Sequence, residues 1–424
     1  MFFRKLATSL AFLGGLSLLW TACGGASFDD PAVIKGLRVI AVQKSSPYPK
    51  PGETVNLKLL FWDGKSTEDN PRDLNIQMFT GPSQVCVNPP GDLYFNCFAP
   101  RDGGIDDDIP DGGDDGGAPD GGTPDGDIPE AGTSNARRVA SAPSAVTSSG
   151  ATPGSASSTV GFTRLTSGGF NFKDFALAET VEATRVVAPS GSHDVDHIRE
   201  ATLRIPRGTV DGHQTPPGFT EEQRYGLVYV LFVACAGTPR PVLNAGPNQL
   251  PFGCFDAEGR QLGSDDFVIG YTSMYVYNNR PNNNPVIDGL SFVTPSGTAS
   301  LDDSIADEAA APHIPSCKGD RTKCTKYTLA PLINKDLTDE EDLDPTAVSP
   351  SGKRLHEQVW VTYYLTAGEF KSSVRLVNDA TQGWNYKNEA EFTAPGEPGP
   401  VRFFAVVHDN RGGVAWVEGK IIVD

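Results

Sequence analysis

The sequence lacks the features by which an enzyme or a nucleic-acid-binding protein is usually recognised. Lysine and arginine number 35 against 53 aspartates and glutamates, a formal net charge of −18, so the basic face that nucleic acid requires is missing. No GxSxG, P-loop or GxGxxG motif follows an expected strand, and such motifs place a nucleophile or hold a phosphate. We therefore predict no catalysis, no cofactor and no nucleic-acid partner.

Patterns that hold a metal ion are also scarce. The sequence contains no CxxC, the spacing typical of zinc sites. His193 and His197 lie four residues apart, but their stretch is polar and has no HExxH glutamate. Asp265 and Asp266 are adjacent, whereas the carboxylates of a glycosidase face each other across a cleft. We expect the histidine pair on an exposed loop, the acid pair on a solvated loop face, and no metal site.

The first apolar run is too short to cross a membrane. It covers residues 6–20, whereas a spanning helix needs about 20 residues. Two basic residues precede it and two small residues follow it, as in a secretory leader. The pattern predicts a signal peptide over residues 1–22 and a flexible tether over residues 23–31.

The end of this leader resembles the lipobox of bacterial lipoproteins. Thr21 and Ala22 are small, and Cys23 follows them directly. The resemblance implies that the chain is cut just before Cys23, that the thiol of Cys23 is diacylated, and that the lipid anchors the chain to a membrane. Trp20 departs from the family's branched aliphatic residue, and the alternative is a plain secretory leader with an unrelated cysteine. Gly24, in place of an aspartate, favours the outer membrane over the inner.

Six further cysteines agree with export from the cytosol. An even number of cysteines outside the cytosol predicts disulfides. Proximity in the sequence favours Cys86–Cys97, Cys235–Cys254 and Cys317–Cys324. A cross-sheet pair, Cys86–Cys235, is the alternative.

The composition and periodicity predict an all-β fold. The chain has 46 glycines, 34 prolines and only 3 methionines, a turn-rich profile. Val55, Leu57, Leu59 and Phe61 alternate with polar residues at the start of their run, which predicts a half-buried strand. Further strands are expected at the following ranges: 37–42, 75–79, 201–206, 225–236, 267–277, 286–292, 359–365, 373–377, 401–408 and 414–423.

Residues 101–158 contain almost no large apolar groups. Such a segment cannot bury enough surface to offset its chain entropy, so we predict a disordered acidic and serine-rich insertion. Its aspartates are weak candidates for calcium ligands, namely Asp106, Asp108, Asp114 and Asp115. The regular spacing and closing glutamate of calcium loops are missing, and a solvated spacer is the preferred interpretation.

Two segments resemble bacterial immunoglobulin-like domains. Residues 51–55, PGETV, are similar to the turn that leads into the second strand of such domains. Residues 401–423 form two expected strands around Asp-Asn-Arg-Gly-Gly and resemble the final hairpin of PKD-like domains. The resemblance implies two immunoglobulin-like β-sandwich modules, residues 32–279 and 280–424, with an Asn/Pro-rich linker between them and the insertion inside the first.

Together, the lipobox, the Asp-Gly tract and these modules resemble predicted envelope lipoproteins of myxobacteria. The resemblance implies a lipid-anchored protein of the cell envelope with a structural, adhesive or partner-binding role, whose partner is an envelope protein or a glycan. The alternatives are an accessory or substrate-binding subunit of an envelope enzyme or secretion system, and a secreted hydrolase. Four aromatic residues are weighed as a sugar platform, but strand cores are their expected place, namely Trp360, Tyr363, Tyr364 and Trp384.

Overall fold

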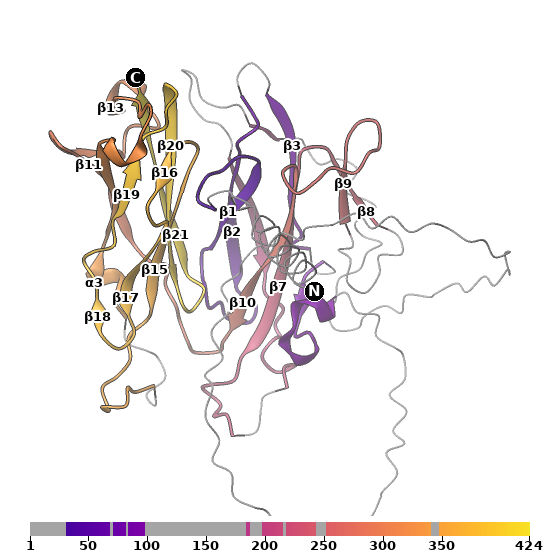
Figure 1. Ribbon diagram of the computed structural model, residues 1–424. Coiled ribbons are helices and arrows are strands. Elements are labelled where there is room, and N and C mark those ends of the chain that lie inside the picture. The colour runs from indigo at the N-terminus through magenta and orange to yellow at the C-terminus, as the bar shows by residue number, and fades with distance from the viewer. Residues whose placement is uncertain are drawn as a thin grey trace, which may run out of the picture.

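The computed structural model describes residues 31–67, 71–81, 84–97, 184–186, 197–214, 218–242, 252–340 and 347–424. These residues form an almost entirely β structure, with paired sheets (Figure 1), which confirms the predicted fold class. The leader, Cys23, the acidic insertion and the four candidate calcium ligands lie outside the described residues.

Strands β1 to β10 form what we call the N-terminal module. One sheet has the order β1 (Leu37–Lys44), β2 (Thr54–Asp63), β6 (Ile198–Arg204). The facing sheet has the order β10 (Phe267–Val276), β7 (Gly226–Cys235), β3 (Arg72–Met78), β5 (Thr184–Val186), and β4 (Cys86–Val87) also pairs with β7. A separate hairpin joins β8 (Thr238–Pro241) and β9 (Phe252–Phe255). Apolar side chains of the two sheets meet between them.

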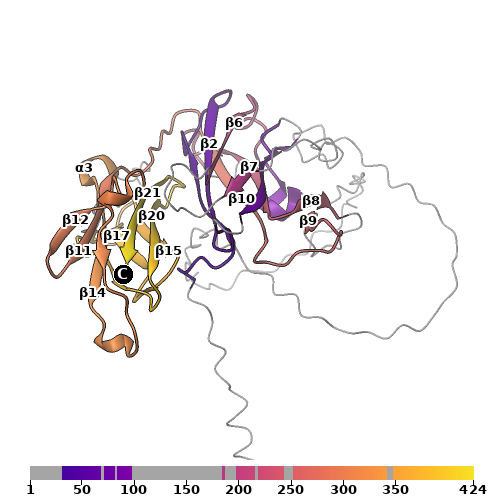
Figure 2. The same cartoon turned by 90° about the horizontal axis from the view of Figure 1, so that it is seen from above.

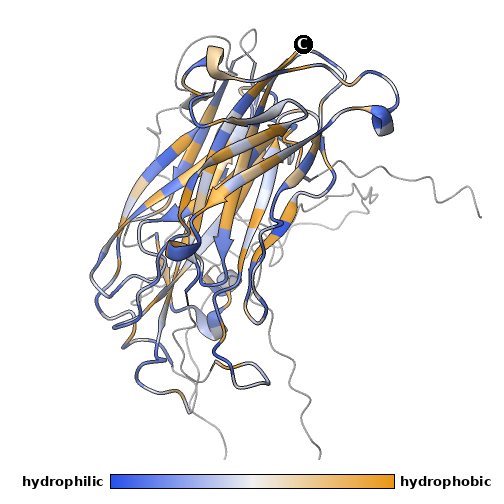
Figure 3. Ribbon diagram, turned by 90° about the vertical axis from the view of Figure 1, so that its left-hand side faces the viewer, coloured by the Kyte–Doolittle hydropathy of each residue, from blue (hydrophilic) through white to orange (hydrophobic). Residues whose placement is uncertain are grey.

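Strands β11 to β21 form the C-terminal module. One sheet runs β12 (Gly297–Ser300), β11 (Ile287–Thr294), β14 (Lys326–Ile333), β19 (Ala390–Thr393), β16 (Glu369–Phe370). The other runs β13 (His313–Ile314), β21 (Val414–Val423), β20 (Gly399–Asp409), β15 (Val359–Leu365), β17 (Val374–Asp379), β18 (Gly383–Trp384). An aromatic core fills the space between them. Seen from the side of the C-terminal module, apolar stretches follow the strands and hydrophilic residues follow the turns (Figure 3).

Short helices occur only in connections of the described chain. They are η1 (Pro90–Asp92), η2 (Tyr94–Cys97), η3 (Glu308–Ala310), η4 (Arg321–Lys323) and α3 (Lys335–Thr338). The predicted final hairpin is confirmed, because β20 and β21 pair directly up to His408 and Val414. Its turn is stabilised by Asp409, whose carboxylate accepts hydrogen bonds from the backbone N–H groups of Arg411 and Gly413 at 2.8 and 2.7 Å.

Strand β7 is buried at every position. One of its faces packs in the core of the N-terminal module, and the other is covered by β4, η2 and the β8–β9 hairpin. Two disulfides hold this cover in place, Cys86–Cys97 and Cys235–Cys254, while Cys317–Cys324 closes a loop of the C-terminal module. All three pairs are those that sequence proximity predicted.

The two modules pack sheet against sheet. The predicted inner face of β2 is confirmed, but Leu60 and Trp62 are also buried, so the prediction of a half-buried strand is wrong for the second half of β2. These two side chains pack against Phe404 and Val406 of β20. The sheet of β1, β2 and β6 therefore lies between the other N-terminal sheet and the C-terminal module (Figure 2).

Candidate functional site at the module junction

A pocket of about 690 Å³ opens where the two modules are joined. One wall comes from the turn between β1 and β2, and the other from the segment that links the modules. The lining residues are Ser45, Ser46, Tyr48, Lys50, Pro51, Gly52, Glu53, Pro281, Asn282 and Asn283. The PGETV turn and the Asn/Pro-rich linker therefore meet at this pocket. The sequence identified them only as a turn and a linker.

The turn that forms the first wall is fixed by its own residues. Prolines interrupt the strand pattern, and Gly52 has a φ of +82°, a conformation that favours glycine. The carboxylate of Glu53 accepts a hydrogen bond from the backbone N–H of Lys50 at 2.7 Å. The backbone N–H of Gly52 donates to the carbonyl of Ile205 in the neighbouring β6 segment at 3.0 Å, so the wall is held against the sheet.

Behind the pocket lies a group of buried polar side chains, which we call the polar boundary cluster. Its members are Lys44, Asn282, Glu357, Asp409 and Arg411, and all are buried. The ammonium of Lys44 donates to the carbonyl of Ser273 at 3.2 Å. The Arg411 Nε and Glu357 Oε1 atoms lie 3.4 Å apart. These contacts place two cations and two carboxylates together at the boundary of the modules.

Burial changes the protonation of this cluster. It lowers the pKa of Lys44 to about 8, an effect that the nearby Asp409 partly opposes. Burial also raises the pKa of Asp409, against hydrogen bonds from the backbone of Gly413 and Arg411. On the next residue, burial and the charge of Lys44 lower the pKa of His408 to about 4, so His408 is neutral at pH 7.

Three consecutive asparagines of the linker form hydrogen bonds at the junction, and one of them, Asn284, bonds to both modules. Asn284 donates from its amide to the carbonyl of Lys44 at 2.7 Å and accepts from the backbone N–H of Val414 at 2.9 Å. Asn283 donates to Glu340 at 3.0 Å. Asn282 donates to Asp409 at 3.4 Å, and its Oδ1 atom is buried without a hydrogen-bond partner. The linker is therefore a fixed part of the junction.

A group of tyrosines, which we call the tyrosine face, extends from the pocket along the outer side of β7 and β10. The ring of Tyr48 lies 4.9 Å from that of Tyr277 and 6.3 Å from that of Tyr275. Tyr225 continues the series, 5.2 Å from Tyr275. Farther along, Tyr94, Tyr229 and Tyr271 contact one another. Alternation in residues 271–277 was the sequence signal for this surface, and it was not recognised as one.

Asp92 lies at the far side of the tyrosine face and accepts two side-chain hydrogen bonds. The Nε2 atom of His213 is 2.8 Å from its Oδ1, and the hydroxyl of Tyr225 donates to its Oδ2 at 2.7 Å. The other ring nitrogen of His213 is buried and has no hydrogen-bond partner among the described residues. A His–Asp pair acts in nucleophilic catalysis only when a hydroxyl or thiol reaches that nitrogen, and here none does within the described chain.

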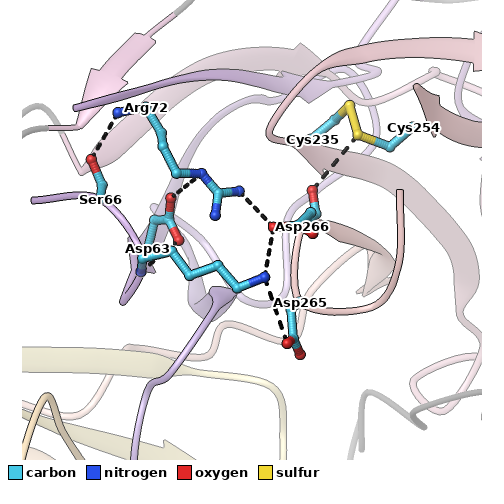
Figure 4. Close-up of polar contacts among 8 residues, drawn as sticks. Asp63, Ser66, Arg72, Cys235, Cys254, Asp265 and Asp266 are labelled. Atoms are coloured by element: carbon cyan, nitrogen blue, oxygen red, sulfur yellow. Dashed lines mark hydrogen bonds and ion pairs between the residues drawn. A yellow bond between two sulfur atoms is a disulfide. The ribbon is translucent and has the colours of Figure 1, made fainter. Parts of the chain in front are cut away.

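The acid pair that the sequence placed on a solvated loop divides between two environments. Asp265 is largely exposed, whereas Asp266 accepts hydrogen bonds from Lys65 at 2.9 Å and Arg72 at 2.8 Å (Figure 4). The expectation is therefore wrong for Asp266. Burial alone would raise its pKa, but the bonds from Lys65 and Arg72 outweigh burial and lower it.

Arg72 also holds the buried Asp63, with its Nε atom 3.1 Å from the Oδ2 atom of Asp63. Burial raises the pKa of Asp63 despite this partner. The network joins the end of β2, the start of β3 and the segment before β10 (Figure 4). Because its carboxylates are already neutralised by Arg72 and Lys65, the network connects the sheets and does not form a pair of glycosidase carboxylates.

The second histidine of the predicted pair, His197, does not lie on an exposed loop. His197 is buried, and its Nε2 atom lies 2.8 Å from the Oε1 atom of Glu418 across the module boundary. Arg402 approaches the other oxygen of Glu418 at 3.4 Å and lies 4.6 Å from the centre of the Trp62 ring. The expectation is wrong because β2 and β6 face the C-terminal module. His193 lies outside the described residues.

The four candidate platform aromatics pack in the protein, as expected for strand residues. Tyr363 is fully buried and donates to the carbonyl of Asn388 at 2.5 Å. Trp360 stacks on His408, and Tyr364 and Trp384 pack against apolar clusters. Within the described ranges, no group of three or more histidine, cysteine, aspartate or glutamate side chains is placed to hold a metal ion.

No helix in the described part of the chain is long and apolar enough to cross a membrane. Comparison with known proteins finds no matching family model and no matching curated protein. Among solved structures, the chain is similar to dimeric latent PorU from Porphyromonas gingivalis, with 9% identity, 92% of this chain and 24% of that chain covered, and a TM-score of 0.16. The match thus spans about a quarter of PorU, and a TM-score this low does not indicate a shared overall fold.

Proposed function

We propose that this protein is a lipid-anchored, non-catalytic protein of the bacterial cell envelope, attached through Cys23, whose two modules hold a partner-binding surface away from the membrane. One observation carries the proposal. The chain has seven cysteines, and three disulfides use six of them. The remaining cysteine is Cys23, which stands where a lipoprotein leader is cut.

The packing of the modules supports a presenting role. The apolar contact between β2 and β20 and the polar boundary cluster join the modules along one boundary. A binding surface at the junction is therefore held in one geometry, which lowers the entropy lost when a partner binds. Gly24 after the anchor favours the outer membrane as the site of attachment.

A second role, as an accessory or substrate-binding subunit of an envelope enzyme or secretion system, is favoured by the junction pocket. Its volume lies within the range of about 300–1,000 Å³ that is usual for ligand sites. In this role the protein also binds without catalysis, and only the destination of the ligand differs. The two roles therefore make the same prediction for the anchor.

The anchor is tested by replacing its thiol. In a Gram-negative host that expresses the chain with its leader, Cys23→Ser should abolish incorporation of a palmitate analogue and move the protein from the membrane to the soluble fraction. Two or more acyl chains are needed for stable anchoring, so the expected loss is nearly complete. Ser27→Ala, a change of similar size in the tether, should leave both readouts unchanged. The lipoprotein proposal fails if Cys23→Ser still sediments with membranes.

A further inference from the structure

We propose that the junction pocket binds an uncharged oligosaccharide, with Tyr48 as the aromatic contact and the amides of Asn282 and Asn283 as hydrogen-bonding partners. This rests on the proposed partner-binding role and specifies its ligand.

The charges around the pocket are balanced. In the lining, Lys50 and Glu53 carry opposite charges and lie in one turn. In the polar boundary cluster behind it, two cations, Lys44 and Arg411, accompany two carboxylates, Asp409 and Glu357. Beside the pocket, Glu340 at Asn283 and Arg280 over the ring of Tyr277 add one charge of each sign. A site for a phosphate, a sulfate or a carboxylate needs a surplus of cations or of backbone donors. The balance favours a ligand without net charge.

The second wall contains a polar group that lacks a partner. Asn282 is 5% exposed, and its Oδ1 atom is buried and accepts no hydrogen bond. An unsatisfied buried acceptor costs about 1–3 kcal/mol. The amide makes a long hydrogen bond to Asp409 at 3.4 Å, and Asn282 lines the pocket. A sugar hydroxyl supplies a donor for this acceptor and also accepts hydrogen bonds from the amide of the exposed Asn283.

The first wall supplies an aromatic ring beside these amides. The hydroxyl of Tyr48 has no hydrogen-bond partner among the described residues, while its ring packs on Tyr277. Tyr275, 41% exposed, continues the aromatic surface away from the pocket. A pyranose ring has an apolar C–H face and polar hydroxyl edges, which match an aromatic ring bordered by amides. Because the pocket is open and the exposed ring of Tyr275 continues from it, a chain of several sugars fits better than a single one.

The test uses the full lipidated chain in a zwitterionic detergent, since the headgroup of a maltoside detergent is itself an uncharged sugar. Binding of chitohexaose, cellohexaose and maltohexaose is measured by calorimetry. We expect at least one of them to bind with a Kd between about 10 μM and 1 mM, a range typical of weak and transient contacts. Tyr48→Ala should weaken this binding at least tenfold, and Asn283→Ala at least threefold.

Two further variants show whether a loss arises from the pocket. Tyr48→Phe keeps the ring and should stay within threefold of the unchanged protein, and Tyr386→Ala removes an exposed tyrosine of the C-terminal module (76% exposed) and should have no effect. If Tyr48→Ala fails to fold, the affinity of Asn283→Ala, a change at an exposed residue, tests the proposal by itself.

The proposal is overturned if none of the hexasaccharides binds at 10 mM, if only a charged glycan such as heparin binds, or if Tyr48→Ala and Asn283→Ala bind as well as the unchanged protein. Any of these results leaves the membrane attachment of Cys23 untouched and separately testable.

Discussion

The boundary between the modules has two parts that are built on opposite principles. One part, which we call the apolar boundary patch, consists of Ile34, Ile40, Ala41, Leu60, Trp62, Phe404, Val406 and Val414. The other is the polar boundary cluster beside the junction pocket. Both parts join the same two sheets, yet the first contains no charged group and the second contains two buried cations and two buried carboxylates.

The two parts contribute to the boundary in different ways. Apolar burial stabilises roughly in proportion to the area removed from water and has no preferred direction. Buried charges recover little of their desolvation cost, but their hydrogen bonds are directional. We therefore expect the apolar boundary patch to supply most of the stability of the boundary. The polar boundary cluster should fix the angle of the modules and the shape of the pocket.

The largest effect is expected from the apolar boundary patch. Trp62→Ala removes a buried indole that packs on Phe404 at 5.7 Å and lies under Arg402. Large-to-small changes of this kind cost about 3–5 kcal/mol, so the free energy of unfolding in urea should fall by this amount and the modules should unfold in separate steps. Tyr386→Ala, at an exposed site, should change it by less than about 0.5 kcal/mol. A single unchanged transition for Trp62→Ala would show that the polar boundary cluster alone holds the modules together.

The sequence predicted those parts of the fold that depend on local pattern. The alternation of Val55 to Phe61 defined the inner face of β2, and each disulfide closes a short loop that proximity identifies. The burial of Leu60 and Trp62 was missed because their partners lie in β20, more than three hundred residues away. Strand β14 was also missed, since Pro331 within it argues against a strand.

The junction pocket was beyond sequence reasoning for the same physical reason. Lys44, Asn282 and Asp409 lie in three distant segments, and only the packing of the modules brings them together. The turn after β20 was predicted as a hairpin from its Asp-Asn-Arg-Gly-Gly composition. Its second role, in which Asp409 and Arg411 enter the boundary, has no local signal.

The pH dependence of the free energy of unfolding measures the cost of burying the charge of Lys44 in the polar boundary cluster. Lys44 has a pKa of about 8 in the folded chain and about 10.5 when unfolded. Between these values the unfolded chain binds more protons at this amine, so Lys44 contributes a rise in the free energy of unfolding from pH 8 to pH 10.5. Buried tyrosines such as Tyr94 and Tyr363, whose pKa values are raised by burial, oppose this rise near pH 10. Below pH 8 the folded chain carries the full cost of the charged group, about 3 kcal/mol.

Denaturant titrations across this pH range, repeated on Lys44→Met, check the assignment. The variant should lose the rise between pH 8 and pH 10.5, because no buried amine remains to titrate. Lys58→Met, the same change at an exposed site on β2, should keep it. If Lys44→Met and the unchanged protein show the same slope, the amine of Lys44 is not responsible for it.

The smallest effect is expected where a polar contact borders the apolar boundary patch. His197→Phe removes the hydrogen bond to Glu418 but leaves Arg402 beside the same carboxylate. The loss should be about 1.5–3 kcal/mol, the contribution of one hydrogen bond to a charged group. His197→Gln retains a donor and should recover part of it, as urea unfolding of the two variants at pH 7 will show. A larger loss for His197→Phe than for Trp62→Ala would reverse the comparison, because it would mean that one charged contact outweighs the apolar packing around it.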